Sequence, residues 1–288
     1  MIRVGTRGSA LAVAQASWVA DRLGADSELV TVVTAGDRGG SELDKSRWVS
    51  ELERALLDDE IDLAVHSAKD VPAELAAGLE LVAIPTRADP RDAICGAPSL
   101  DELPDGALVG TSSLRRAAQV RAARPDVEVV PMRGNVDTRL RKLAAGECQA
   151  LVLALAGLQR LGRAGEAQGL LGDLVPAAGQ GALAVEARPG RVPDECLIAL
   201  RDPEAQACVT AEREVVRALG ASCNTPLGVH GRIVGGTLEL SAWVGLLDGS
   251  HWIADRVLDE PRSAPARLVQ RLESVGAGEL LRLAEGAA

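Results

Sequence analysis

The sequence predicts an α/β protein built from two doubly wound lobes, followed by a small α+β domain at the C-terminus. Short apolar strands alternate with helical segments up to about residue 203, and this alternation favours parallel sheets in both lobes. Two links rich in Pro and Gly, at 85–90 and 174–181, bracket the middle of the chain. The middle lobe is therefore expected to be inserted into the first.

The first lobe is expected to begin with a strand at 2–4 and a helix at 10–23, for which Ser9 is a good N-cap residue. A polar, Gly-containing loop is expected at 38–47. The remaining elements of this lobe are strands at 30–33, 61–65, 79–84 and 182–187 and a helix at 48–57.

The inserted lobe repeats the alternation of strands and helices. One of its helices carries Arg115, Arg116, Arg121 and Arg124, and the next carries Arg139, Arg141 and Lys142. Its strands are expected at 107–109, 127–132 and 149–156.

The pattern changes in the last part of the chain. A helix is expected at 204–219, and another begins near Ser263 and Pro265. Three strands, at 229–234, 238–246 and 251–258, are separated by Gly235-Gly236 and Asp248-Gly249, which are hairpin signals. The expected domains are 1–88 with 180–203 (domain 1), 89–179 (domain 2) and 204–288 (domain 3).

The composition is that of an ordinary globular protein, with 47% hydrophobic and 25% charged residues. A net charge of -10 argues against nucleic-acid binding and against a membrane-surface role. The chain enters its first strand without a basic, apolar leader, and no segment approaches the length of a membrane span. We therefore expect a protein of the reducing cytoplasm. With four Trp and no Phe or Tyr, its cores must be filled by Leu, Val, Ile and Ala.

Five cysteines at scattered positions contain no Cys-x-x-Cys pair, so neither a disulfide framework nor a zinc site is expected. The three histidines are too scattered to predict any other metal site. Four cysteines lie in apolar or helical contexts that suit a small buried side chain. Cys223 instead lies among small and turn-forming residues at 220–228, where an electrophile can reach its thiolate. An inert loop thiol is the alternative.

The stretch from His66 to Pro72 joins an apolar strand to polar residues of opposite charge. Pro72 disfavours helical backbone at Val71, so the segment is expected to stay extended beyond the sheet. Lys69 and Asp70 would then point to opposite sides. The carboxyl end of a parallel strand is where open α/β sheets bind ligands. The alternative is a solvated turn between a strand and a loop.

Three junctions share one pattern, in which a strand ends, a short Gly, Ser, Thr or Asn segment follows, and a helix begins beside arginine. Helix N-termini offer free N–H groups, and the arginine fork binds carboxylates bidentately. Any one junction alone would be an ordinary helix cap, but three over two lobes indicate a site for a molecule with several carboxylates. Phosphate is less favoured because the chain has no Gly-x-x-x-x-Gly-Lys-Ser/Thr loop. The arginines are Arg7, Arg115, Arg116, Arg133 and Arg139.

Motifs along almost the whole chain resemble the porphobilinogen deaminase family. They include Val-Gly-Thr-Arg-Gly-Ser at 4–9, Ala-Val-His-Ser-Ala-Lys-Asp-Val-Pro at 64–72, Gly-Thr-Ser-Ser-Leu-Arg-Arg at 110–116, Arg-Gly-Asn-Val-Asp-Thr-Arg at 133–139 and the Cys223 loop. The resemblance implies three domains, of which the first two resemble type II periplasmic binding proteins. Two departures stand out: Ala35 replaces a usual arginine, and the loop at 38–47 is shorter than in the family.

The resemblance also implies a role for individual residues. Asp70 would be the catalytic carboxylate, and Cys223 would carry a dipyrromethane cofactor through a thioether. The residues implied around the acidic side groups of the cofactor are Ser67, Lys69, Thr111, Ser113, Arg115, Arg116, Arg133 and Arg139. Those implied around the substrate are Arg7, Ser9, Gln180, Trp48 and Lys45. His66 receives no role, and a structural one is expected for it.

The activity that the resemblance implies is that of hydroxymethylbilane synthase, a transferase of porphyrin, tetrapyrrole and heme biosynthesis. Such an enzyme condenses four porphobilinogen molecules with loss of ammonia and releases the linear product by hydrolysis. We expect a monomer with no nucleic-acid or membrane partner. The alternative is a two-lobed polycarboxylate-binding protein without catalysis.

Overall fold

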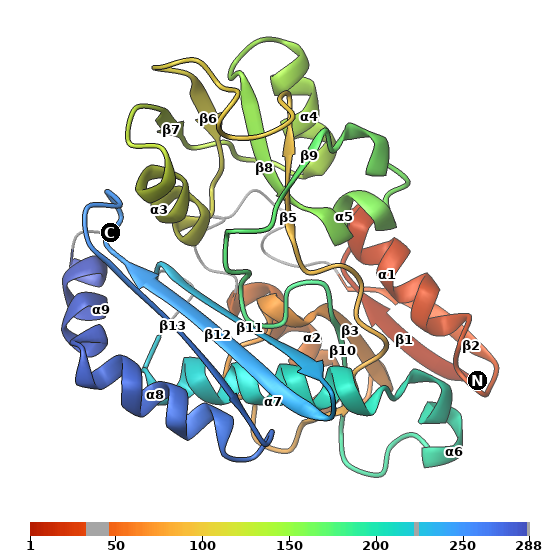
Figure 1. Ribbon diagram of the computed structural model, residues 1–288. Coiled ribbons are helices and arrows are strands. Elements are labelled where there is room, and N and C mark those ends of the chain that lie inside the picture. The colour runs from red at the N-terminus through yellow and green to blue at the C-terminus, as the bar shows by residue number, and fades with distance from the viewer. Residues whose placement is uncertain (33–45, 222–224, 287–288) are drawn as a thin grey trace. The chain divides into compact units, whose positions relative to one another are not determined.

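The computed structural model describes residues 1–32, 46–221 and 225–286, and the side chains of 46–48 are outside it (Figure 1). The chain divides into two compact units. Unit 1 comprises Met1–Ala88 and Gly179–Thr210, and unit 2 comprises Asp89–Ala178 and Ala211–Ala288. Among the described residues, no helix is long and apolar enough to cross a membrane.

Unit 1 is built around a five-stranded sheet with the order β2-β1-β3-β10-β4. Helix α1 packs on one face of this sheet and α2 on the other, so the lobe is doubly wound as predicted. The strands are β1 (Ile2–Thr6), β2 (Ser27–Thr31), β3 (Leu63–Ser67), β4 (Glu80–Ala83) and β10 (Leu183–Ala187). The helices are α1 (Ala10–Ala20), α2 (Ser46–Leu57) and α6 (Asp194–Leu197), with 3-10 turns at Ala68–Asp70 and Ile198–Leu200.

Unit 2 contains a second five-stranded sheet, with the order β7-β6-β8-β5-β9. Helix α3 covers one face, and α4 and α5 cover the other. The strands are β5 (Asp92–Cys95), β6 (Leu108–Gly110), β7 (Glu128–Val130), β8 (Ala150–Ala154) and β9 (Gly169–Leu171). The helices are α3 (Leu114–Ala123), α4 (Val136–Ala144) and α5 (Leu155–Arg160), with a 3-10 turn at Ala164–Glu166.

The two sheets have equivalent strand orders, but neither is fully parallel as the sequence predicted. In each sheet one strand, β10 or β5, runs antiparallel to both of its neighbours. Each of these strands follows one of the two links between the lobes, where no helix carries the chain back across the sheet. A parallel pair needs such a crossover, so the strand that enters from a link is free to run the other way.

The second sheet of unit 2 is a three-stranded antiparallel meander, β11-β12-β13. Helices α8 and α9 pack against β12 and bury alternate strand residues, among them Leu238 and Leu240, beside Leu268 and Leu272. This is the predicted α+β arrangement. Its elements are α7 (Pro203–Ala218), β11 (Leu227–Val234), β12 (Thr237–Gly245), β13 (Trp252–Asp259), α8 (Ala264–Ser274) and α9 (Ala277–Gly286).

Close backbone contacts join this small sheet to the five-stranded lobe of unit 2. Arg121 of α3 donates from Nη1 to the carbonyl of Leu247 at 2.7 Å. Gly249, at the hairpin tip, has a positive φ of 76°, and a Cβ there would lie 2.5 Å from the backbone nitrogen of Ala122. The hairpin therefore sits directly on α3, which explains why residues 211–288 group with 89–178.

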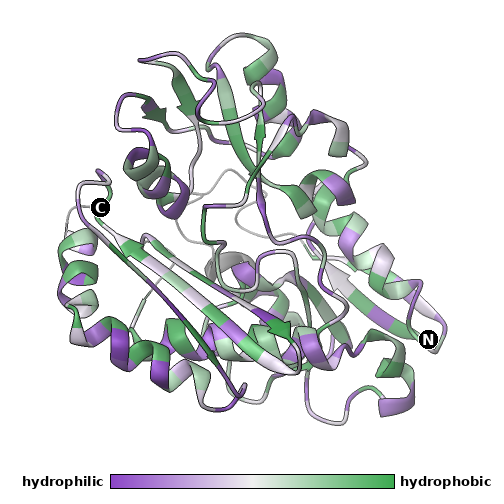
Figure 2. Cartoon of the chain, viewed as in Figure 1, coloured by the Kyte–Doolittle hydropathy of each residue, from purple (hydrophilic) through white to green (hydrophobic). Residues whose placement is uncertain are grey.

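The cores are filled almost entirely by aliphatic side chains, as the lack of Phe and Tyr requires. The hydrophobic residues concentrate in the central strands of the sheets (Figure 2). Burying each large aliphatic side chain contributes about 1.5–3 kcal/mol. The fully buried large residues include Leu52, Leu63, Ile94, Leu151, Leu158, Leu197 and Leu240.

Most predicted elements are present, with shifts at their ends. Strand β3 begins two residues later than expected and includes His66 and Ser67. The strand predicted at 149–156 ends at Ala154, where α5 begins. Strands β5 and β9 were not predicted. Each is short and follows a loop, so neither shows a clear alternation of its own.

Candidate active site

The strand order of unit 1 reverses between β1 and β3, because the chain leaves β1 toward β2 on one side and returns to β3 on the other. Open α/β sheets bind ligands outside the carboxyl ends of the strands at such a switch point. The predicted segment Arg7–Ser9 follows β1 directly, and the segment Ser67–Asp70 begins with the last residue of β3. The sheet thus brings together two groups of predicted site residues.

Asp70 lies in a 3-10 turn, not in the extended segment predicted from Pro72. The prediction was right for Val71, which has φ -79° and ψ 125°, but wrong for Ala68–Asp70. The turn is closed by the backbone N–H of Val71, which donates to the carbonyl of Ala68 at 3.3 Å, and it is tied to the rest of the sheet by the backbone N–H of Ala68, which donates to the carbonyl of Ala182 at 3.0 Å. That partner is distant in sequence, so a local pattern could not reveal it.

Gly179 allows this turn to pack closely on the segment that leads into β10. Its φ is +72°, and a Cβ at this position would lie 2.8 Å from the carbonyl carbon of Ala68 and 2.9 Å from the backbone nitrogen of Lys69. Only glycine combines this conformation with so close an approach. The next residue, Gln180, is buried, and its carbonyl accepts a hydrogen bond from Nε of Arg87 at 2.8 Å.

The other predicted residues of unit 1 have defined local contacts. Ser9 caps α1, since its hydroxyl accepts from the backbone N–H of Ala12 at 3.3 Å. The Ser67 hydroxyl accepts from Nε2 of the buried Gln15 at 2.8 Å. Arg7, Lys69 and Asp70 are half-buried. These side chains therefore combine partial shielding from water with access to solvent.

In unit 2 the equivalent switch point lies between β6 and β8. Helix α3 follows β6 and is capped by Ser113, which accepts from the backbone N–H of Arg116 at 3.4 Å. Helix α4 follows β7 and is capped by Asn135. All three predicted helix N-termini are therefore confirmed. Arg133 is exposed beside the α4 cap, whereas Arg139 is half-buried and donates from Nε to the carbonyl of Gly134 at 2.6 Å.

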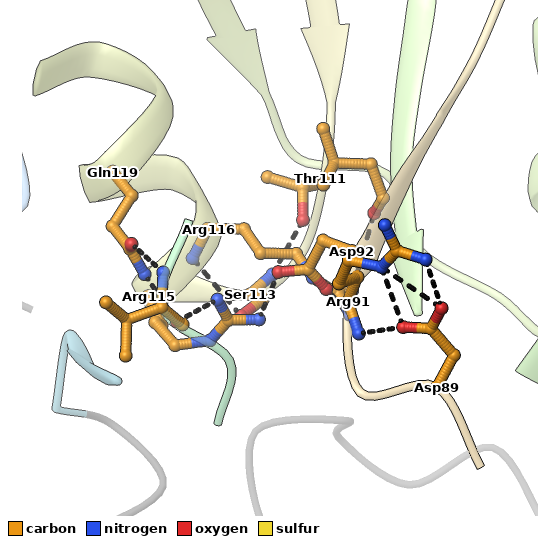
Figure 3. Close-up of polar contacts among 10 residues, drawn as sticks. Asp89, Arg91, Asp92, Thr111, Ser113, Arg115, Arg116 and Gln119 are labelled. Atoms are coloured by element: carbon orange, nitrogen blue, oxygen red, sulfur yellow. Dashed lines mark hydrogen bonds and ion pairs between the residues drawn. The ribbon is translucent and has the colours of Figure 1, made fainter. Parts of the chain in front are cut away.

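A buried carboxylate that sequence reasoning missed, Asp92, binds Arg115 and Arg116, the first two arginines of α3 (Figure 3). Nη2 of Arg115 lies 2.8 Å from Oδ2 of Asp92, and Nε of Arg116 lies 2.9 Å from Oδ1. The exposed fraction of the side chain is 4% for Arg115, 7% for Arg116 and 0% for Asp92. Arg115 also donates to the carbonyl of Val175 at 2.7 Å, with Gln119 bonded to the same residue.

In this cluster two guanidinium groups share the carboxylate of Asp92. Burial lowers the pKa of Arg115, and the nearby Arg116 lowers it further, while Asp92 opposes both effects. The Nε of Arg115 is buried and has no hydrogen-bond partner among the described residues. A buried guanidinium group with an unused donor favours an anion, and a carboxylate fits it best.

Cys223 itself lies outside the described residues, but both of its flanks belong to unit 2. On the N-terminal side α7 ends before Gly220, which has a φ of 64°. On the C-terminal side a Cβ on Gly228 would lie 2.5 Å from the carbonyl oxygen of Val175, the group that accepts from Arg115. The C-terminal flank therefore lies beside a residue that is hydrogen-bonded to Arg115.

The other four cysteines are buried, as predicted. Burial raises the pKa of Cys95 to about 11 and also raises the pKa of Cys148. A thiol of this kind holds little of the reactive thiolate near neutral pH. No group of three or more His, Cys, Asp and Glu side chains that could hold a metal ion occurs in the described part of the chain. Lys45 and the side chain of Trp48 lie outside the described residues.

The fold and the site together define a class of protein, with two doubly wound α/β lobes that carry arginines and capped helix N-termini at the carboxyl ends of their strands. Residues 2–193 match the family model "Porphobilinogen deaminase, dipyromethane cofactor binding domain", and residues 206–273 match "Porphobilinogen deaminase, C-terminal domain". The chain belongs to the porphobilinogen deaminase family.

Relatives with this name match over most of their length. The porphobilinogen deaminase of Deinococcus deserti is 46% identical over 280 residues, covering 90% of each chain. That of Thiobacillus denitrificans is 44% identical over 301 residues, covering 97% of each. Among solved structures, a periplasmic substrate-binding protein of an ABC transporter from Coxiella burnetii aligns with a TM-score of 0.44 and 15% identity, covering 72% of this chain and 94% of that chain.

Proposed function

We propose that this protein is a hydroxymethylbilane synthase, a transferase that condenses four porphobilinogen molecules and releases linear hydroxymethylbilane. The observation that carries the proposal is Asp70, a half-buried carboxylate in a fixed turn at the switch point of a sheet, in a chain that matches the family throughout. A binding protein without catalysis is not favoured, because the matched family is one of enzymes.

The residues of unit 2 fit a dipyrromethane cofactor, whose acidic side groups need fixed cations and hydroxyl groups. We propose that Thr111, Ser113, Arg115, Arg116, Arg133 and Arg139 hold these groups, with Ser67 and Lys69 from unit 1. The buried, unpartnered Nε of Arg115 supports this assignment. When bound, the cofactor supplies the pyrrole α-carbon to which the first substrate is joined.

Cys223 is the residue proposed to carry the cofactor through a thioether. Two observations support the choice. The four described cysteines are buried, and the flanks of Cys223 belong to the same unit as the Asp92 cluster.

Asp70 is proposed to act on the substrate. Porphobilinogen loses ammonia and becomes a cationic azafulvene, which the Asp70 carboxylate stabilises through its charge and through the pyrrole N–H. The same carboxylate is proposed to take and return protons during the condensation. At about 4 Å and an effective dielectric near 20, one charge pair is worth about 4 kcal/mol. That corresponds to roughly a thousandfold in rate.

The remaining assignments concern the incoming substrate and the organisation of the chain. Arg7, Ser9 and Gln180, together with Lys45 and Trp48, are proposed to bind the acetate and propionate groups of porphobilinogen. We further propose three domains, 1–88 with 180–203, 89–179 and 204–288, in a cytoplasmic monomer without nucleic-acid or membrane partners. The net charge of -10 supports the last point.

Intact mass and turnover test the proposed function together. Protein made in a heme-competent host should carry a mass excess on Cys223 and should consume porphobilinogen. An Asp70→Asn variant should fold and keep the mass excess, yet turn over about a thousandfold more slowly, because the amide cannot neutralise the cation. A bare Cys223 in a protein that does not consume porphobilinogen would refute the function. Near wild-type turnover of Asp70→Asn would remove Asp70 from its role.

A further inference from the structure

His66 and Glu186 form a buried pair directly before the turn that carries Asp70. Nε2 of His66 lies 2.9 Å from Oε2 of Glu186, and the two side chains are 4% and 0% exposed. His66 is the penultimate residue of β3, and Glu186 lies in the neighbouring strand β10. The pair therefore joins two neighbouring antiparallel strands near the carboxyl end of β3, where the turn with Asp70 begins.

The register of the strands places the pair on one face of the sheet. Ala184 is directly opposite His66, so Glu186, two residues further on, is its diagonal neighbour on that face. Helix α2 covers this face through Leu52 and carries the half-buried Glu53. Burial raises the pKa of Glu53, and the charge of Glu186 raises it further.

Stability does not explain this pair well. A buried ion pair usually stabilises a fold no better than two apolar side chains of the same size, because both groups lose their hydration. Here the second carboxylate oxygen of Glu186, Oε1, is buried with no hydrogen-bond partner in the described part of the chain. An apolar pair at this position would avoid that cost.

The position of the pair suggests another purpose. The following residue, Ser67, points to the opposite face, where its hydroxyl accepts from the buried Gln15 of α1. The last two residues of β3 are therefore held by side chains on both faces of the sheet. The 3-10 turn with Asp70 leaves the strand at this point.

We propose that the His66–Glu186 pair, with Gln15 on the opposite face, is a positioning device that fixes the end of β3 and thereby the direction of Asp70. The proposal rests on the proposed function. It assigns no chemical step to His66 or Glu186, since neither needs to touch the substrate. The pair acts by holding the Asp70 carboxylate in its position, because a displacement of about 1 Å in a catalytic group can lower the rate about a hundredfold.

Replacing the whole pair by apolar residues separates positioning from stability. The double variant His66→Leu/Glu186→Leu should unfold at or above the wild-type Tm. Its kcat with porphobilinogen should nevertheless fall about 10- to 100-fold. The mass excess on Cys223 should remain, because the cluster around Asp92 is untouched. A double variant that folds and keeps kcat within about twofold of wild type would overturn the proposal.

A matched pair of single variants decides the question if the double variant does not fold. His66→Gln keeps an amide that can reach Glu186, whereas His66→Asn is one methylene shorter and cannot. We expect His66→Gln to retain most of kcat and His66→Asn to lose at least tenfold. Equal kcat values for the two variants would contradict the proposal.

Asp62→Asn provides the control, since Asp62 pairs with Arg3 beside the other end of β3. It should lower Tm and leave kcat unchanged. A wild-type protein that does not consume porphobilinogen would instead refute the proposed function and not the positioning role alone.

Discussion

Asp92 is the residue on which Arg115 and Arg116 of α3 depend. It is fully buried and faces two guanidinium groups that are themselves nearly buried, at 2.8 and 2.9 Å. An arginine left without this carboxylate would be an uncompensated charge in a region of low dielectric. The orientation of Arg115 and Arg116 is therefore set by a residue outside the motif that contains them.

Substituting Asp92 should have a large effect. Asp92→Asn is expected to lower the free energy of unfolding by about 3–5 kcal/mol, because both arginines lose their ionic partner. It should also reduce the fraction of protein that carries the cofactor. Urea unfolding measures the first effect and intact mass measures the second.

Asp89→Asn is the matched control for that experiment. Asp89 lies only three residues before Asp92 and also binds an arginine, Arg91. This pair is partly exposed, however, with 23% of the Asp89 side chain and 48% of the Arg91 side chain accessible to solvent. Surface pairs contribute about 0–1 kcal/mol, so this variant should stay close to wild type. Equal losses in the two variants would show that burial of Asp92 does not matter.

Several residues of the site could be predicted from sequence because their roles are local. Ser9, Ser113 and Asn135 cap helices that begin within a few residues, and a short pattern is enough to predict a cap. Asp92 could not be found this way, since its partners lie in a helix that follows a different strand. The contact of the Ala68–Asp70 turn with Ala182 was missed for the same reason, because the backbone N–H of Ala68 donates to a carbonyl that is distant in sequence.

At the scale of elements, the packing of the Asp70 turn against Gly179 makes a direct prediction. Gly179→Ala should lower both the unfolding free energy and kcat. The new methyl group would meet the backbone of Ala68 and Lys69, in addition to the strain of a positive φ. Unfolding curves and steady-state kinetics on the same sample measure the two effects.

Gly190→Ala isolates the contribution of backbone strain. Gly190 has φ +70°, nearly the same as Gly179, but nothing lies within 4 Å of its Cβ position. The Gly190→Ala variant should lose about 1–2 kcal/mol of unfolding free energy, because alanine is strained in the left-handed conformation. Its kcat should stay at the wild-type value. If Gly179→Ala behaved like Gly190→Ala, close packing would not be what orients the turn.

The start of β3 makes a prediction about acid stability. Burial alone would raise the pKa of Asp62, but hydrogen bonds from Arg3 and Arg191 hold this pKa well below its usual range. Because the pKa of Asp62 is lower in the folded protein than in the unfolded chain, its ionised carboxylate stabilises the fold at every pH above the unfolded-state pKa of about 3.9. This stabilisation is lost as the pH falls below about 3.9. The gap in unfolding free energy between wild type and Asp62→Asn should therefore be constant from pH 7 to 5 and shrink below about pH 4. A gap that does not change with pH would contradict the assignment.

At the scale of the whole molecule, the distribution of cysteines predicts a labelling pattern. Cys95, Cys148, Cys196 and Cys208 are all buried. Native protein treated with iodoacetamide at pH 8 should take up no label, because these four thiols are shielded and the fifth, that of Cys223, is proposed to be held by the cofactor. Denatured protein should take up four labels. Mass spectrometry that finds a fifth would show that Cys223 is bare.

The fold class was predictable at this scale because it depends on regular alternation and on two conspicuous links. The direction of β5 and β10 was not, because an extended segment looks the same whichever way it runs. Only the register, such as Val185 beside Val65, shows that the incoming strand is antiparallel.

The place of β10 in its sheet also governs the order in which the molecule can be completed during synthesis. The inserted lobe is made from one continuous stretch, 89–178, and contains all five of its strands. The lobe that begins the chain lacks β10 until residues 183–187 leave the ribosome, and without it β4 has no partner in the sheet. The first lobe to be started is therefore the later one to be finished, and a nascent chain must keep an open sheet edge protected until the second link has been made.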